Sequence, residues 1–289
     1  MATLRQIRRR IRSVQGIQRV TRAMKMMATA RLRRAQEAVQ AARPYAENLQ
    51  RLLGLLIRQV EDYRHPLLEQ REPNRNVLIV ITADRGLCGA FNANAIRTAT
   101  ERLRQLPEGT PLICLGARGA NHFERRGFPV LASYRDVFQR LRIEQARVVA
   151  RDLVARYSRA EVDRVEVVFN EFRSMLHQVP VVETLLPISW ETGAQETPLD
   201  PALYLYEPNR AAILDQLLPY YVETILWRMM LESNASEQAA RMNAMENATK
   251  NADEMIEQLI LQRNRVRQTM ITKEIAEIVG GAEALKATT

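Results

Sequence analysis

The first sixty residues place apolar and polar side chains at helical intervals. From Ile7 to Val60, apolar or small residues recur three or four positions apart, and the series includes Ile17, Val20 and Tyr45. Such alternating intervals are typical of the seam of a helix packed in a coiled coil. At 1.5 Å per residue, about 60 residues would reach about 90 Å. The sequence therefore predicts one long N-terminal helix, with Gly16 and Pro44 as points where it can bend.

The pattern changes between residues 76 and 189, where short aliphatic runs alternate with amphipathic stretches. The runs read NVLIVIT, PLICLG, PVLASY, DRVEVVF and QVPVVETLL, and the helical stretches lie at 93–106, 117–126 and within 141–157. Alternating strands and helices are typical of an α/β domain with a largely parallel sheet. We therefore expect a compact, Rossmann-like α/β globular domain, followed by a proline-bearing connector at 191–208.

A second long helix is predicted after that connector. The chain has no glycine or proline between Tyr220 and Val279, and apolar residues recur there at helical intervals, including Met255, Met270, Ile275 and Ile278. Gly280 and Gly281 are plausible stop signals, although residues 282–285 could form one further turn. Small residues in ASEQAARMNAMENA indicate close approach of two helices.

Neither long helix can bury its apolar stripe alone. The economical arrangement is an antiparallel coiled coil of the two, with the α/β domain inserted between them in the sequence. We therefore divide the chain into an N-terminal shaft helix at 1–65, the globular domain at 76–190 and a C-terminal shaft helix at 209–289.

The net charge of +9 is concentrated at the N-terminus. Residues 1–40 hold eleven basic residues and one acid, Glu37. An excess of this kind suits an anionic partner. Arg8, Arg9 and the arginines at 10 and 12 cannot share one exposed stripe, which favours a helix surrounded by protein. A basic coiled-coil protein that binds nucleic acid is the alternative, although few aromatic residues lie among these arginines.

Other chemistry finds little support in the sequence. No aliphatic run approaches the roughly 20 residues of a membrane span. Cys88 and Cys114 lack the spacing of a zinc site or a disulfide framework, which fits a reducing compartment. There is no secretory signal, and the apolar spacing continues past residue 50, so we do not expect a removable transit peptide. Three scattered histidines offer no ligand spacing. We predict no catalytic residue, metal or cofactor.

The glycines between Asp84 and Gly89 invite comparison with a phosphate-binding loop. A glycine turn between a strand and a helix can present backbone N–H groups to an anion. However, the sequence contains neither GxGxxG nor GxxxxGK[ST]. We therefore interpret this segment as a tight strand-to-helix turn, in which Asp84 and Arg85 are structural partners rather than catalysts.

Three segments resemble one known family in order and spacing. They are IRRRIRSVQGIQRVTRAMKMMATARLRRAQ at 7–36, TADRGLCGAFN at 82–92, and ESNASEQAARMNAMENATKNADEMIEQLILQRNRVRQTMITKEIAEIVGGAEAL at 232–285. The first resembles the N-terminal shaft helix of the F-type ATP synthase gamma family. The second is similar to the loop after the first strand of that family's globular domain, and the third to its C-terminal helix.

The resemblance implies a non-catalytic central rotor shaft. Ion-driven rotation of a membrane ring would be coupled through it to the conformational cycling of catalytic sites in an alpha/beta hexamer. Implied partners are the ATP synthase alpha and beta subunits, the epsilon subunit and the membrane c-ring, with no nucleic acid and no small-molecule substrate. The implied location is peripheral, on the cytoplasmic face of a bacterial inner membrane.

The resemblance also implies two sets of contact residues. Contacts with the alpha/beta ring are expected from Arg8, Arg9, Met24, Lys25, Arg265, Arg267, Gln268 and Thr272. Lys25 departs from the family pattern, because many relatives have an acid or another polar residue there. Foot contacts with the epsilon subunit and the c-ring are expected from Tyr204, Tyr206 and Glu207, in the motif YLYEP.

Overall fold

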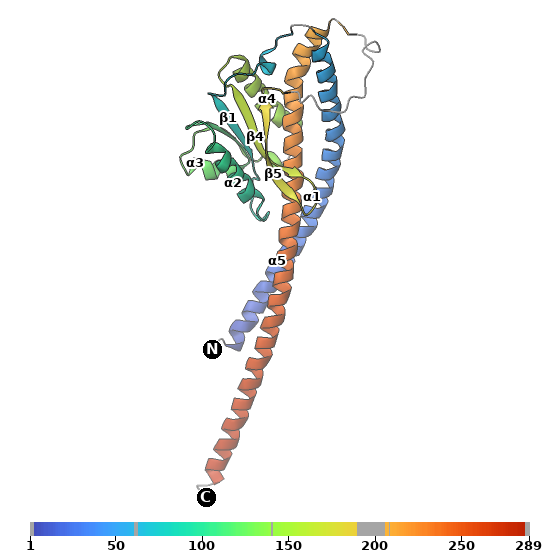
Figure 1. Ribbon diagram of the computed structural model, residues 1–289. Helices are drawn as coiled ribbons and strands as arrows, with labels where there is room; N and C mark the ends of the chain where they lie inside the picture. Colours follow the sequence, from blue (N-terminus) through green and yellow to red (C-terminus); the bar gives the residue numbers. More distant parts are fainter. Residues whose placement is uncertain (1–2, 61–62, 140, 190–205, 208, 287–289) are drawn as a thin grey trace. The chain divides into compact units, whose positions relative to one another are not determined.

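The computed structural model describes residues 3–60, 63–139, 141–189, 206–207 and 209–286. The chain divides into two compact units, one of residues 1–28 with 242–289 and the other of residues 29–241. Two long helices contribute to both units: α1 (Leu4–Arg58) and α5 (Arg210–Lys286) (Figure 1). The α/β elements lie between them in the sequence and belong to the larger unit.

The larger unit contains a five-stranded sheet. Its strands are β1 (Asn76–Ile81), β2 (Leu112–Leu115), β3 (Val130–Tyr134), β4 (Arg164–Phe172) and β5 (Gln178–Leu186). Their spatial order is β3-β2-β1-β4-β5, and every neighbouring pair is parallel except β4 with β5. The predicted α/β fold with a largely parallel sheet is confirmed.

Helices cover both faces of this sheet. The three between the strands are α2 (Phe91–Leu103), α3 (Ala117–Glu124) and α4 (Ile143–Ser158), and short 3-10 turns lie at Pro66–Leu68 and Val137–Gln139. Successive strand residues point to opposite faces. In β1, Leu78 and Val80 pack in a core with α2 and α3, whereas Ile79 and Ile81 pack in a larger core with α4, α1 and α5.

Tyr157 is the largest fully buried side chain among the described residues, and it anchors α4. Its hydroxyl donates to the carbonyl oxygen of Glu69 at 2.8 Å. The Arg71 guanidinium lies 4.9 Å from the ring centre and also donates to the Tyr157 carbonyl oxygen at 2.9 Å. Burial raises the pKa of Tyr157. One aromatic residue therefore ties α4 to the segment that precedes β1.

In the smaller unit, α1 and α5 pair in antiparallel fashion. Ile7, Ile11 and Val14 share an apolar cluster with Ala252 and Leu259 of α5. Further along α1 the seam becomes polar. The Gln18 amide donates to Asp253, and the hydroxyls of Thr21 and Thr249 lie 2.8 Å apart. The predicted antiparallel coiled coil is confirmed in this unit.

The prediction that Ile17 and Val20 belong to the seam was wrong. Their side chains are 55% and 58% exposed. The heptad spacing from Ile11 and Val14 continues to residues 18 and 21 rather than to 17 and 20. Because Gln18 and Thr21 find polar partners on α5, the helix keeps its spacing through a pair of polar positions.

Helix α5 spans most of the predicted C-terminal segment of 209–289. It begins at Arg210 and includes Pro219, and it continues through Gly280 and Gly281 to Lys286, so of the two alternatives the glycines do not stop the helix and the further turn forms. Buried Leu214, Leu218 and Val222 hold the helix against the core across the proline. Glycine in a helix costs only about 1 kcal/mol relative to alanine, and it ends a helix only where the backbone turns left-handed.

Candidate functional site: partner surfaces and the helix–sheet junction

The residues predicted to contact the surrounding ring are mostly exposed on the two helices of the smaller unit. Arg8 and Arg9 are exposed on α1, and Arg265, Arg267 and Gln268 are exposed on α5. Thr272 is also exposed, and its hydroxyl donates to the Gln268 carbonyl oxygen at 3.0 Å. These residues can present charged and amide groups to a partner without disturbing the seam.

Met24 and Lys25 lie closer to the interface between α1 and α5 than the exposed residues above. Both side chains are half-buried. The ammonium of Lys25 lies 3.1 Å from the carboxylate of Glu246 on α5, and Lys250 lies 3.9 Å from the same carboxylate. Lys25 therefore forms an ion pair within this chain.

The C-terminal part of α5 carries apolar side chains into solvent. Val266 still packs against the cluster of Ile7 and Ile11. Beyond it, Met270, Ile275 and Ile278 are exposed, so their predicted place in the helix seam was wrong, as it was for Met255. Met255 lies between Ala252 and Leu259, which pack on α1, so it faces away from that helix, whereas the other three residues follow the last α5 residues of the shared cluster. This stretch is an apolar surface within the described chain.

The predicted foot residues belong to the segment before α5. Tyr204 lies outside the described residues. Tyr206 packs partly buried against the larger core, and the Arg210 guanidinium lies 4.8 Å from its ring centre. Glu207 is exposed. The motif therefore combines an aromatic residue packed on the helix base with an exposed carboxylate.

At the carboxyl ends of β1, β2 and β3, hydrogen bonds to Asp84 link the segments that follow these strands. The strand order reverses between β1 and β4, and in open α/β sheets ligands bind at the carboxyl ends of the strands at such a point. The Asp84 carboxylate, just after β1, accepts hydrogen bonds from the backbone N–H groups of Ala117 (3.0 Å), Asp136 (2.9 Å) and Phe138 (3.1 Å). The structural role predicted for Asp84 is confirmed.

Helix α5 crosses the same region. Arg241 donates to the carbonyl oxygen of Gly86 at 2.6 Å and pairs with Glu237 on its own helix. Burial raises the pKa of Glu237, while the hydrogen bond from Arg241 opposes that rise. Burial also raises the pKa of the Cys88 thiol, whose surroundings include Glu237. A thiol with a raised pKa forms little of the reactive thiolate at neutral pH. The described residues contain no His, Cys, Asp or Glu group suited to a metal ion.

Replacing Asp84 by alanine should lower the free energy of unfolding by about 2 kcal/mol, because three backbone N–H groups would lose a charged acceptor. Urea unfolding followed by circular dichroism measures this loss. The matched control is Arg85→Ala, since Arg85 is the exposed neighbour and surface substitutions usually stay within about 0.5 kcal/mol. Equal losses for the two variants would contradict the structural role of Asp84.

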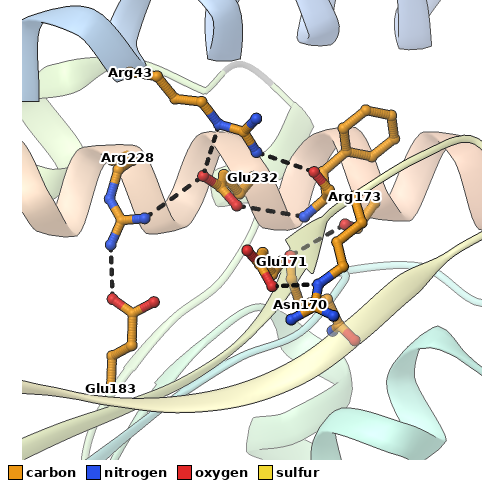
Figure 2. Close-up of polar contacts among 9 residues, drawn as sticks. Arg43, Asn170, Glu171, Arg173, Glu183, Arg228 and Glu232 are labelled. Atoms are coloured by element: carbon orange, nitrogen blue, oxygen red, sulfur yellow. Dashed lines mark hydrogen bonds and ion pairs between the residues drawn. The ribbon is translucent and has the colours of Figure 1, made fainter. Parts of the chain in front are cut away.

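A buried carboxylate joins α5 to the sheet and to α1. The Glu232 side chain is 2% exposed and accepts from Arg43 Nε of α1 at 3.3 Å and from the backbone N–H of Phe172 of β4 at 3.3 Å. Arg228, one turn earlier on α5, approaches Glu232 at 3.6 Å and Glu183 of β5 at 2.6 Å. Figure 2 shows Glu232 between the two arginines. We call these residues, Arg43, Phe172, Glu183, Arg228 and Glu232, the junction.

Sequence reasoning missed the junction and misassigned its neighbours. The small residues after Glu232 were expected only to bring two helices close together. Ala235 does pack against Ala35 and Val39 of α1. Ser233 and Ser236, however, face β4, where they bond to the backbone N–H and carbonyl oxygen of Asn170, each at 3.1 Å. The sequence did offer one sign that α5 packs against a strand as well as against α1. Two serines lie three positions apart beside a glutamate, in a segment otherwise rich in small residues.

These features together define a class of protein: an α/β body inserted in the sequence between two helices that pair with each other and hold the body through buried charges. The family model described as ATP synthase matches residues 3–285. The chain is 49% identical to the ATP synthase gamma chain of Chlorobium phaeobacteroides and 47% identical to that of Desulforamulus reducens. Both matches cover 99% of this chain and 100% of the relative.

The chain belongs to the gamma chain family of F-type ATP synthases. It is thus a rotor subunit of the central stalk and not the catalytic subunit. Solved structures share the fold. A chain of the Euglena gracilis mitochondrial ATP synthase gives a TM-score of 0.70 at 19% identity, covering 98% of this chain and 95% of that one. A chain of the Tetrahymena thermophila central stalk gives 0.60 at 23% identity, covering 79% and 99%. No helix among the described residues is both long enough and apolar enough to span a membrane.

Proposed function

We propose that this rotor subunit couples ion-driven rotation of a membrane c-ring to the conformational cycling of catalytic sites in a hexamer of alpha and beta subunits. Each angular position of an asymmetric helix pair would stabilise one state of each neighbouring site through different contacts. The full-length match to gamma chains carries this proposal. The exposed arginines of α1 and the exposed polar and apolar residues of α5 support it, because they offer surfaces to surrounding protein.

The finer assignments follow from the same proposal. Arg8, Arg9, Met24, Lys25, Arg265, Arg267, Gln268 and Thr272 would contact the alpha/beta ring. Tyr204, Tyr206 and Glu207 would contact the epsilon subunit and the c-ring. The complex would place the chain peripherally, on the cytoplasmic face of a bacterial inner membrane. The nucleic-acid alternative has no support from the family match.

Co-purification tests the proposed partners. We expect a tagged version of this chain, extracted from its own membranes with a mild detergent, to be recovered in stoichiometric amount with alpha, beta, epsilon and c-ring subunits and with ATPase activity. The control is the soluble sector released from the same membranes at low ionic strength. The chain should be recovered in that fraction with alpha, beta and epsilon, and the c-ring should stay in the membrane. Recovery of the chain without any large ATPase would contradict the proposal.

A further inference from the structure

The α/β body and the helix pair share a large apolar contact in the unit of residues 29–241. Leu53 and Leu56 of α1 and Leu226 and Met229 of α5 are fully buried in the core that also contains β1 and β4. Apolar burial is strong but non-directional, so it resists separation of the surfaces more than it fixes their angle. Charge-assisted hydrogen bonds fix geometry as well as distance. A rotor needs a fixed angle between two parts wherever torque passes from one to the other.

Glu232 supplies directional contacts to several elements at once. Its two carboxylate oxygens reach α1 through Arg43 and β4 through the N–H of Phe172. Arg43 completes a ring of hydrogen bonds with Glu232 and Phe172, because it also donates to the Phe172 carbonyl oxygen at 3.0 Å. Arg228 extends the connection to Glu183 on β5. The end of β4 is therefore held to α1 and α5 by a closed ring of hydrogen bonds (Figure 2).

Burial makes this ring sensitive to the loss of any member. Removing one partner of a buried pair leaves the other charge uncompensated in a poorly solvated place. Arg43 is 42% exposed and can turn to water, but the Glu232 side chain at 2% exposure cannot. Glu232 is thus the residue whose charge the arrangement depends on most.

A second glutamate of α5 provides a natural comparison. Glu223 also binds two arginines, Arg147 and Arg151, each at 3.0 Å. Both arginines belong to α4, so this cluster ties α5 to one surface helix and includes neither α1 nor a strand. The two glutamates have similar chemistry and different connections.

We propose that Glu232 is the positioning residue that locks the α/β body to the helix pair against rotation, so that torque passes between them without angular slack. This inference rests on the rotor function. It assigns that role to the junction and not to the apolar core or to Glu223.

The test uses the assembled ATPase sector with beads attached to single introduced cysteines. Arg125→Cys, exposed at the end of α3, reports on the α/β body, and Arg51→Cys, exposed on α1, reports on the helix pair. The native thiols of Cys88 and Cys114 are buried, so labelling within this chain is selective. The bead's angular variance during the pauses of ATP-driven rotation measures how stiffly its attachment point follows the motor.

With Glu232→Gln, we expect the variance of the body bead to rise at least about twofold, because the ring loses its charge-assisted bonds. The variance of the helix bead should be unchanged. Arg43→Gln opens the same ring without changing Glu232, which keeps Arg228 and the N–H of Phe172, so it should give a rise of the same kind in the body bead. Glu223→Gln should raise the variance of the body bead less than Glu232→Gln, because its two arginines connect α5 to α4 alone.

Two outcomes would overturn the inference. One is an unchanged body bead in both junction variants, and the other is an equal rise for both attachment points, which would indicate general loosening. Failure of the rotor function is a separate result, since the unsubstituted chain would then show no ATP-driven rotation from either bead.

Discussion

Replacing both Arg267 and Gln268 by leucine should slow ATP synthesis and ATP hydrolysis in the assembled complex by about tenfold, because a charge-assisted hydrogen bond is worth about 1.5 to 3 kcal/mol and 1.4 kcal/mol is a factor of ten. Both side chains are exposed on α5 and take no part in the cluster that pairs it with α1. The helix pair should therefore remain folded. The measurement is turnover in reconstituted complexes, normalised to assembled enzyme.

The matched control is deletion of residues 284–289, which removes the end of the chain without touching these polar groups. Its effect on turnover should be less than about twofold, as is usual for changes away from specific contacts. An unchanged rate in the double variant, together with loss of activity on deletion, would mean that the coupling contacts lie at the extreme end of α5 instead.

Replacing Tyr157 by alanine should cost about 3 to 5 kcal/mol in the free energy of unfolding, the range for removing a large aromatic side chain from a packed core. The variant loses ring packing, the hydrogen bond to Glu69 and the contact with Arg71 together. Tyr157→Phe keeps the ring and loses only the hydroxyl bond, so it should cost about 1 kcal/mol. Urea unfolding monitored by circular dichroism separates the two.

The order of these two losses is the informative result. If Tyr157→Phe were as damaging as Tyr157→Ala, the hydroxyl rather than the ring would dominate at this position. Since α4 is packed against the core along Ala146, Val149, Ala150 and Leu153 as well, the fold should survive both changes.

The strands and the long helices were predictable because each depends on local periodicity. The run from Asn76 to Ile81 is buried at every position, as expected of a parallel strand covered on both faces. The edge strand β3 alternates between half-buried and exposed side chains, yet its aliphatic first residues still indicated a strand. Family resemblance then placed these elements in order.

The seam of the coiled coil was less predictable, because it passes through polar residues. A search for apolar side chains selects Ile17 and Val20, whereas the packed positions are Gln18 and Thr21, each with a polar partner more than two hundred residues away. The role of Glu232 was not predicted, because it is a polar residue at a packed position. Its burial depends on Arg43 and on the end of β4, and a single sequence does not show such distant pairings.

The distribution of lysine, which includes Lys25 beside Glu246, has a practical consequence for chemical labelling. Lysine occurs four times in the whole chain, at positions 25, 250, 273 and 286, and the other 38 basic residues are arginine. All four lie in the sequence of the two long helices. Amine-reactive reagents, apart from their action on the terminal amine, would therefore footprint the helices and leave the α/β body unmarked. Arginine-directed dicarbonyl reagents would be needed to follow that body.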